Sequence, residues 1–168
     1  SNTLAARLSD ATLVRETPYL GGEWLAGQGG DSFDVINPAS GEVLASLPEV
    51  SRQATASAIE AARCAQVAWA AQTGKERGAI LRRWHDLVIA SADDLAAILT
   101  AEMGKPLRES RAEIIYGASY IEWFAEEAKR VYGDVVPGHQ RDKRIVLLRQ
   151  PVGVVGSITP WNFPNAMV

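Results

Sequence analysis

The sequence predicts an α/β fold, and three observations support this. Short alternating segments bounded by turn formers come before residue 50 and are typical of β-ribbons. Residues 51–131 carry four successive segments in which apolar residues recur at helical spacing. The run Val152–Thr159 is almost wholly apolar, which is typical of a strand buried on both faces in a parallel sheet covered by helices. Ribbons, a helical layer and then the start of a parallel sheet indicate α/β.

The composition excludes several classes of protein. The chain has 168 residues, a net charge of −3 and a pI of about 5.4, with no isolated basic cluster, which argues against nucleic-acid binding. No stretch approaches the roughly 18 apolar residues of a membrane span. One cysteine allows no internal disulfide, and Ser1–Leu4 lacks the charged-then-apolar order of a signal peptide. We therefore expect a cytoplasmic protein that binds neither nucleic acid nor membrane.

Two β-ribbons are predicted near the start of the chain. Gly21 and Gly22 supply the positive φ values of a two-residue hairpin turn, and the turn formers of 37–41 join two further strands. The strands are expected within 19–25, 32–36 and 43–47. Residues 4–16 fit either a short helix or a frayed terminus, and 27–30 are expected to form a loop.

Four helices should follow. Ser51 is a suitable N-cap for the first, which should reach Ala71, and Thr73 with Glu76 forms the pattern of a capping box at the start of the second. The third should begin near Ser91 and end at Gly104 and Pro106, and the fourth should run over about 107–131. Each has an apolar face: Ile59, Ala62, Ala65 and Trp69; Ile80, Leu81, Trp84, Leu87 and Val88; Leu95, Ile98 and Leu99; Ile114, Ile115, Ala118, Ile121, Ala125 and Ala128.

The last segment is the best candidate for a functional site. A polar loop over 134–142 and a strand over 144–149 come first, and Pro160 then ends the predicted buried strand. Ligands of open parallel sheets bind beyond the carboxyl ends of the strands, where Trp161 and Asn162 stand. The Asn162 amide could donate a hydrogen bond to a developing oxyanion, or the residue could simply cap a following helix. The chain stops soon afterwards, so we expect a longer protein.

The other candidate residues have simpler explanations. Cys64 stands mid-helix without a positioned base and is best explained as a small helical residue rather than a nucleophile. His85 and His139 are isolated from other ligand-type residues, so we predict no metal site. Gly153 and Gly156 lie inside the predicted strand and do not form a dinucleotide-binding fingerprint.

The segment Gln150–Pro164, with Ile158-Thr-Pro-Trp-Asn-Phe-Pro164 at its end, closely resembles a signature of the aldehyde dehydrogenase superfamily. Other segments look like the same family's N-terminal landmarks: Gly22-Glu-Trp24, Asn37-Pro-Ala-Ser-Gly-Glu42, Ala61 through Trp69, Arg77, and Glu102-Met-Gly-Lys-Pro-Leu107. The resemblance implies the N-terminal part of a Rossmann-type cofactor-binding domain with a helical layer and a β-ribbon arm.

Within the superfamily, three segments look most like the bacterial succinate-semialdehyde dehydrogenases: 122–134, 137–144 and 162–167. The implied reaction is NAD(P)-dependent oxidation of succinate semialdehyde to succinate, a step of 4-aminobutyrate degradation. Two alternatives remain open. The chain could belong to a dehydrogenase of another short aldehyde such as glutarate semialdehyde, or it could be a truncated, inactive cofactor-domain module.

The resemblance also implies residue roles. A cysteine thiolate attacks the aldehyde, an asparagine amide holds the oxyanion, hydride passes to NAD or NADP, and a glutamate-activated water releases the acid. Asn162 matches the asparagine, and Ile158, Thr159, Pro160, Trp161 and Asn162 match the segment beside the nicotinamide and ribose. The nucleophile and the glutamate are expected beyond residue 168.

The same resemblance divides the chain into parts. Residues 1–133 and 151–168 would belong to the NAD(P)-binding domain, residues 134–150 to an arm that joins subunits, and the catalytic domain would be absent. The expected assembly is a homo-oligomer, either a dimer or a dimer of dimers, acting on a small aldehyde.

Overall fold

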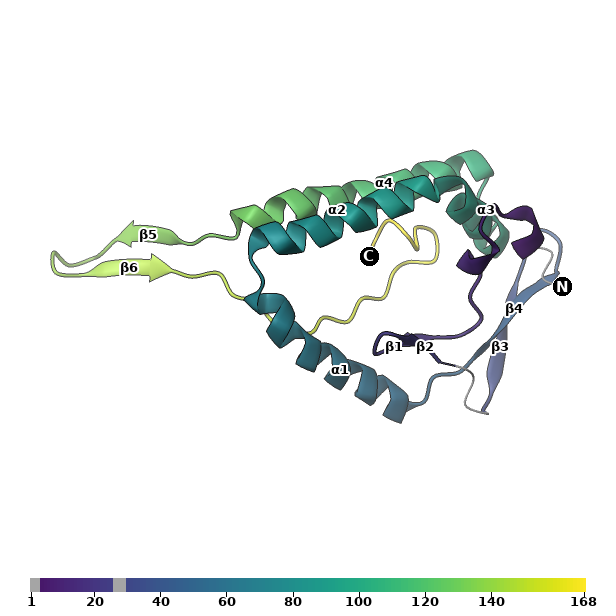
Figure 1. The fold of residues 1–168 in the computed structure, drawn as a ribbon, viewed down its shortest axis with the longest axis horizontal. Helices are drawn as coiled ribbons and strands as arrows, with labels where there is room; N and C mark the ends of the chain where they lie inside the picture. The colour runs from purple at the N-terminus through teal and green to yellow at the C-terminus, as the bar shows by residue number, and fades with distance from the viewer. Residues whose placement is uncertain (1–3, 26–29) are drawn as a thin grey trace.

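A computed structural model describes residues 4–25 and 30–168 (Figure 1). Two 3₁₀ turns, η1 (Ala5–Arg7) and η2 (Ala11–Leu13), form within the stretch 4–16 for which the sequence allowed a short helix. Residues 27–29 of the loop predicted over 27–30 lie outside the described part of the chain, and Gly30 forms a bend.

Three antiparallel ribbons account for the strands of the described chain. They are β1 (Tyr19–Leu20) with β2 (Glu23–Trp24), β3 (Ser32–Ile36) with β4 (Val43–Pro48), and β5 (Asp134–Pro137) with β6 (Arg144–Leu147). The first two ribbons confirm the sequence prediction. The prediction of a loop throughout 134–142 is wrong at its start, because Asp134–Pro137 pairs with Arg144–Leu147 and forms a strand.

The four predicted helices are present. They are α1 (Arg52–Ala71), α2 (Gly74–Ala90), α3 (Ala92–Met103) and α4 (Leu107–Glu127), which ends in the 3₁₀ turn η3 (Ala128–Arg130). Ser51 caps α1 by accepting from the amide of Ala54, and the Thr73–Glu76 capping box begins α2. Both helix starts were predicted because capping is a local interaction between residues three apart.

The core lies where α3 meets α4 and the end of α2. Ala92, Ala96, Leu99 and Ile114 form its buried cluster, and Val88, Leu95 and Met103 pack against it. Figure 1 shows α2 and α4 side by side along most of their length. A Cβ on Gly78 would lie 2.7 Å from the carbonyl oxygen of Ala125, so this glycine permits the close approach of the two helices.

Several predicted apolar faces are not covered. No residue of α1 is buried, and Ile59 and Trp69 of its apolar face are exposed. Ile80, Trp84 and Leu87 of α2 and Ile115 of α4 are also exposed. Helical spacing predicts which side chains share a face, but only a neighbouring element can bury that face.

The predicted buried strand over Val152–Thr159 is wrong for this structure. Residues 151–160 form no strand, and Val152 and Ile158 are 94% and 100% exposed. A strand in a parallel sheet needs neighbouring strands that take its backbone hydrogen bonds, and no described segment of this chain supplies them. The chain instead runs back from the β5–β6 ribbon, between α1 and the α2–α4 pair, to turns at 161–167 (Figure 1).

Candidate functional site

The candidate site is the turn at 161–167, which lies against the start of α4. Gly104 ends α3 in the left-handed conformation, with φ of 80°, and Pro106 precedes the first residue of α4. Lys105 therefore stands at the corner between two helices, where its side chain lies beside α4. This corner depends on glycine, since most residues adopt a positive φ only at a cost.

A buried ion pair joins this corner to α4. The Lys105 ammonium donates to Oε2 of Glu113, and only 9% of the lysine side chain and 1% of the glutamate side chain are exposed. Buried charges are costly unless they are paired and hydrogen-bonded. Each member of this pair therefore has to find further partners, and both find them in the terminal turn.

The Glu113 carboxylate accepts two backbone hydrogen bonds from the turn. The amides of Asn165 and Ala166 lie 3.0 Å and 3.3 Å from its Oε1 atom. Ala166 itself is buried. These bonds attach the end of the turn to the second turn of α4.

Lys105 holds the beginning of the same turn. Its Nζ atom donates to the backbone carbonyl of Asn162 at 2.7 Å, and it lies 4.0 Å from the centre of the Phe163 ring. A cation at this distance over an aromatic face is attracted by the ring quadrupole. The ammonium thus contacts an acid, a carbonyl and a ring.

Two hydroxyl groups connect the backbone of Lys105 to α3 and α4. Thr100 on α3 donates to Ser110 on α4 at 2.8 Å, and Ser110 donates to the carbonyl of Lys105 at 3.5 Å. Ser110 is fully buried. This link ties the ends of both helices to the backbone from which the Lys105 side chain extends.

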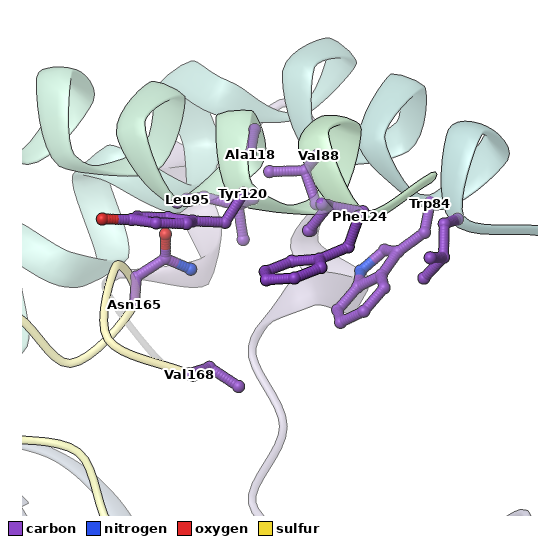
Figure 2. A pocket seen from close by; sticks show the side chains of 11 residues that line it. Trp84, Val88, Leu95, Ala118, Tyr120, Phe124, Asn165 and Val168 are labelled. Carbon is purple, nitrogen blue, oxygen red and sulfur yellow. The ribbon is translucent and has the colours of Figure 1, made fainter. Parts of the chain in front are cut away.

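A mainly apolar cavity of about 420 Å³ lies next to the turn (Figure 2). Leu81, Trp84 and Val88 of α2, Leu95 of α3, five residues of α4, Asn165 and Val168 line it. Figure 2 shows the Asn165 side chain pointing from the turn toward the helices, beside the ring of Tyr120. Its Oδ1 atom is buried without a hydrogen-bond partner among the described residues, and a Cβ on Gly117 would lie 2.4 Å from it.

The predicted site residues lie together in one exposed segment. Trp161 is 81% exposed, Pro160 and Asn162 are also exposed, and Thr159 is half-buried beside the fully exposed Ile158. No helix follows Asn162 in the described chain, so it caps no helix in this structure. Lys105 holds the backbone of Asn162 through its carbonyl oxygen.

Sequence reasoning did not single out Lys105 and Glu113, the two residues that hold this turn. Lys105 lies inside one of the landmark segments, but nothing in that segment points to Glu113 or to the turn 57 residues later. A weak signal does exist, because Glu113 immediately precedes the buried face that begins at Ile114. A carboxylate in that position needs a partner when the face is buried.

The remaining candidates stand apart from this segment. Cys64 is exposed on α1, where its Sγ atom contacts the Glu60 carboxylate at 3.5 Å. His85 pairs with Asp86 at 2.9 Å. Over residues 4–25 and 30–168, no three metal-binding side chains converge. None of the helices in the described ranges is long and apolar enough to cross a membrane.

The chain is similar to known proteins along nearly its whole length. Residues 24–168 match the aldehyde dehydrogenase family. The chain is 55% identical to glutarate-semialdehyde dehydrogenase of Pseudomonas putida and 52% identical to succinate-semialdehyde dehydrogenase [NADP(+)] of Escherichia coli. Each match covers 96% of this chain and 34% of the relative, so the chain spans about a third of the length of these relatives.

A solved structure matches the chain over the same share of its length. The crystal structure of succinate-semialdehyde dehydrogenase from Burkholderia pseudomallei superposes with a TM-score of 0.92 at 55% identity, over 96% of this chain and 33% of that one. The predicted fold class, the N-terminal part of an aldehyde dehydrogenase fold, is thereby confirmed. This chain belongs to the aldehyde dehydrogenase family.

Proposed function

We propose that this chain is the N-terminal part of an NAD(P)-dependent enzyme that oxidises succinate semialdehyde to succinate. The observation that carries the proposal is the position of Asn162, in an exposed segment whose backbone a buried ion pair holds against α4. The names of the relatives support the substrate class, since they include enzymes of succinate semialdehyde and of glutarate semialdehyde. Glutarate semialdehyde is therefore the second candidate substrate.

In this proposal Asn162 donates its side-chain amide to the oxyanion that forms when a thiolate attacks the aldehyde. A fixed donor in a site closed to water stabilises developing charge more than a mobile one does, because it needs no reorganisation. Lys105 supplies part of that rigidity through the Asn162 carbonyl. The nucleophilic cysteine and the glutamate that activates water are expected in the portion of the enzyme that follows residue 168.

The segment 158–162 fits one wall of a dinucleotide cleft. Ile158 and Trp161 present exposed apolar surface, and Thr159, Pro160 and Asn162 place polar side-chain or backbone groups among them. Cofactor sites combine such apolar walls with a few placed polar groups. NAD or NADP, when bound, supplies the nicotinamide that accepts the hydride.

The β5–β6 ribbon fits the proposed subunit arm. It projects away from the helices (Figure 1), and every residue of both strands is exposed. Exposed edges of a ribbon pair readily with another strand. Residues 134–150 would thus join subunits of a cytoplasmic homo-oligomer, a dimer or a dimer of dimers, while 1–133 and 151–168 belong to the cofactor-binding domain.

The direct test uses the complete enzyme and measures NAD or NADP reduction with each semialdehyde. We expect Asn162→Ala to lower kcat by about 10²–10³-fold with a small change in the KM for cofactor. Ser157→Ala is the matched control, because Ser157 is an exposed residue immediately before the segment 158–162. Efficient oxidation of an unrelated aldehyde, with neither semialdehyde turned over, would refute the proposed substrate class. The 168-residue chain alone should be inactive.

A further inference from the structure

We propose that Lys105 and Glu113 form a positioning pair for Asn162, so that this buried ion pair acts in catalysis without touching the substrate. The role depends on the proposed function of Asn162 as the oxyanion donor. Neither residue touches the substrate in the reaction proposed above, yet together they make four hydrogen bonds or ion contacts with each other and the turn.

The pair holds the turn at both ends. Lys105 binds the carbonyl of Asn162, and Glu113 binds the amides of Asn165 and Ala166. A carbonyl belongs to the same rigid peptide unit as the next amide, so a bond to it restricts the ψ angle of Asn162. The Cα of Asn162, and hence the origin of its side chain, is placed relative to α4.

The ion pair between Lys105 and Glu113 is not expected to add much to the free energy of unfolding. Replacing a buried ion pair by neutral side chains of similar volume is often neutral or stabilising, since the desolvation of both charges is avoided. The Lys105 ammonium instead contacts three partners: a carboxylate, a backbone carbonyl and the Phe163 ring. Two of these three partners belong to the terminal turn, which indicates a role in its geometry.

The contact between the Lys105 ammonium and the Phe163 ring also fixes the backbone after Asn162. The ring follows Asn162 directly in the chain, and the ammonium lies 4.0 Å from its centre. The lysine thus contacts residues on both sides of the peptide bond between Asn162 and Phe163. A misplacement of about 1 Å in a catalytic group can cost on the order of 10²-fold in rate. Loss of the Lys105 contacts is therefore expected to lower kcat measurably.

The test measures steady-state kinetics of the complete enzyme with the double substitution Lys105→Met and Glu113→Gln. Both charges are removed together, and the glutamine oxygen can still accept from the amides of Asn165 and Ala166. Urea unfolding of the variant checks that it is folded. We expect kcat to fall by about 10- to 100-fold and the KM for NAD or NADP to change little. The single variant Lys105→Arg keeps the charge and should retain more activity than Lys105→Met.

The decisive comparison repeats the double substitution in the Asn162→Ala enzyme. If Lys105 acts through Asn162, the substitution should then change kcat by less than about twofold. A purely structural role would lower kcat by the same factor in both backgrounds. Arg82→Met is the control, because the ion pairs of Arg82 go to Glu122 and Glu126 of α4 and not to the turn.

Two results would overturn the positioning role. One is wild-type kcat in the Lys105→Met, Glu113→Gln enzyme while Asn162→Ala is impaired, which would leave the proposed function intact. The other is an equal loss of kcat with and without Asn162. Wild-type kcat in Asn162→Ala itself would instead refute the proposed oxyanion donor, and with it the positioning of that donor.

Discussion

The backbone amide of Asn165 donates a hydrogen bond of 3.0 Å to the carboxylate of Glu113, which precedes it by 52 residues. Because the glutamate side chain is buried and paired with Lys105, this bond attaches the end of the chain to α4 at a defined point. The exposed segment that carries Trp161 and Asn162 is therefore anchored at its carboxyl end, although it belongs to no helix or strand.

The close packing of α2 on α4 predicts the effect of Gly78→Ala. A Cβ there would lie 2.7 Å from the backbone oxygen of Ala125, so one helix would have to move. We expect a loss of about 1–3 kcal/mol in the free energy of unfolding, as is typical of overpacking, measured by urea unfolding. Gly156→Ala is the control, since nothing lies within 4 Å of its Cβ. A stabilised Gly78→Ala variant would contradict the packing.

The capping box at the start of α2 predicts the effect of Thr73→Ala. The Thr73 hydroxyl accepts from the amide of Glu76 at 3.3 Å, and the Glu76 carboxylate accepts from the amide of Thr73 at 2.7 Å. Loss of the hydroxyl should cost about 1 kcal/mol of stability, measured by thermal or urea unfolding. Thr73→Ser keeps the oxygen and should lie close to wild type. Equal losses in both variants would point to the methyl group instead of the cap.

The ion pairs between α2 and α4 predict a dependence on pH. Hydrogen bonds from Arg82 lower the pKa of Glu122 and of Glu126 below their usual value of 4.5. The folded protein therefore binds these protons less readily than the unfolded chain does. The stabilisation is complete above the unfolded pKa and is lost as the pH falls through the lower folded values.

Arg82→Met tests this dependence. In urea unfolding, the difference in midpoint between wild type and this variant should be largest at neutral pH and should shrink as the pH falls below 4.5. Added salt should also reduce it, because the pairs are exposed and screened. Arg83→Met, at a neighbouring exposed position, is the control. A difference that persists in acid would mean that the arginine stem, and not its charge, stabilises the helix pair.

The position of Cys64 predicts that it takes no part in the chemistry. Its thiol is exposed on α1 beside the Glu60 carboxylate, and α1 does not contribute to the anchored turn. Cys64→Ser in the complete enzyme should leave kcat unchanged. A thiol reagent should modify Cys64 rapidly in the 168-residue chain, because the side chain is accessible. A large loss of activity in Cys64→Ser would contradict this assignment.

Much of the fold could be predicted from the sequence because its signals are local. Ser51 and Thr73 begin helices through contacts three residues away, and Gly104 ends α3 because its φ of 80° suits glycine. The Gly21–Gly22 turn forms a hairpin for the same reason. Asn162 was singled out as a candidate in the same way, from its place after a proline that ends an apolar run and from the family signature around it, and its role stays a prediction.

Only the tertiary structure decided which of these patterns are buried and which residues meet. Val152–Thr159 has the composition of a buried strand but is mostly exposed, because a strand forms only where neighbouring strands accept its hydrogen bonds. Nothing in the sequence pairs Lys105 with Glu113, and they meet each other and the last turn only because α3, α4 and that turn converge. Capping and turn geometry act between near neighbours and are written in short segments. Burial depends on how the whole chain packs, and the hydrogen bonds that hold the last turn on Glu113 join residues 52 and 53 positions apart.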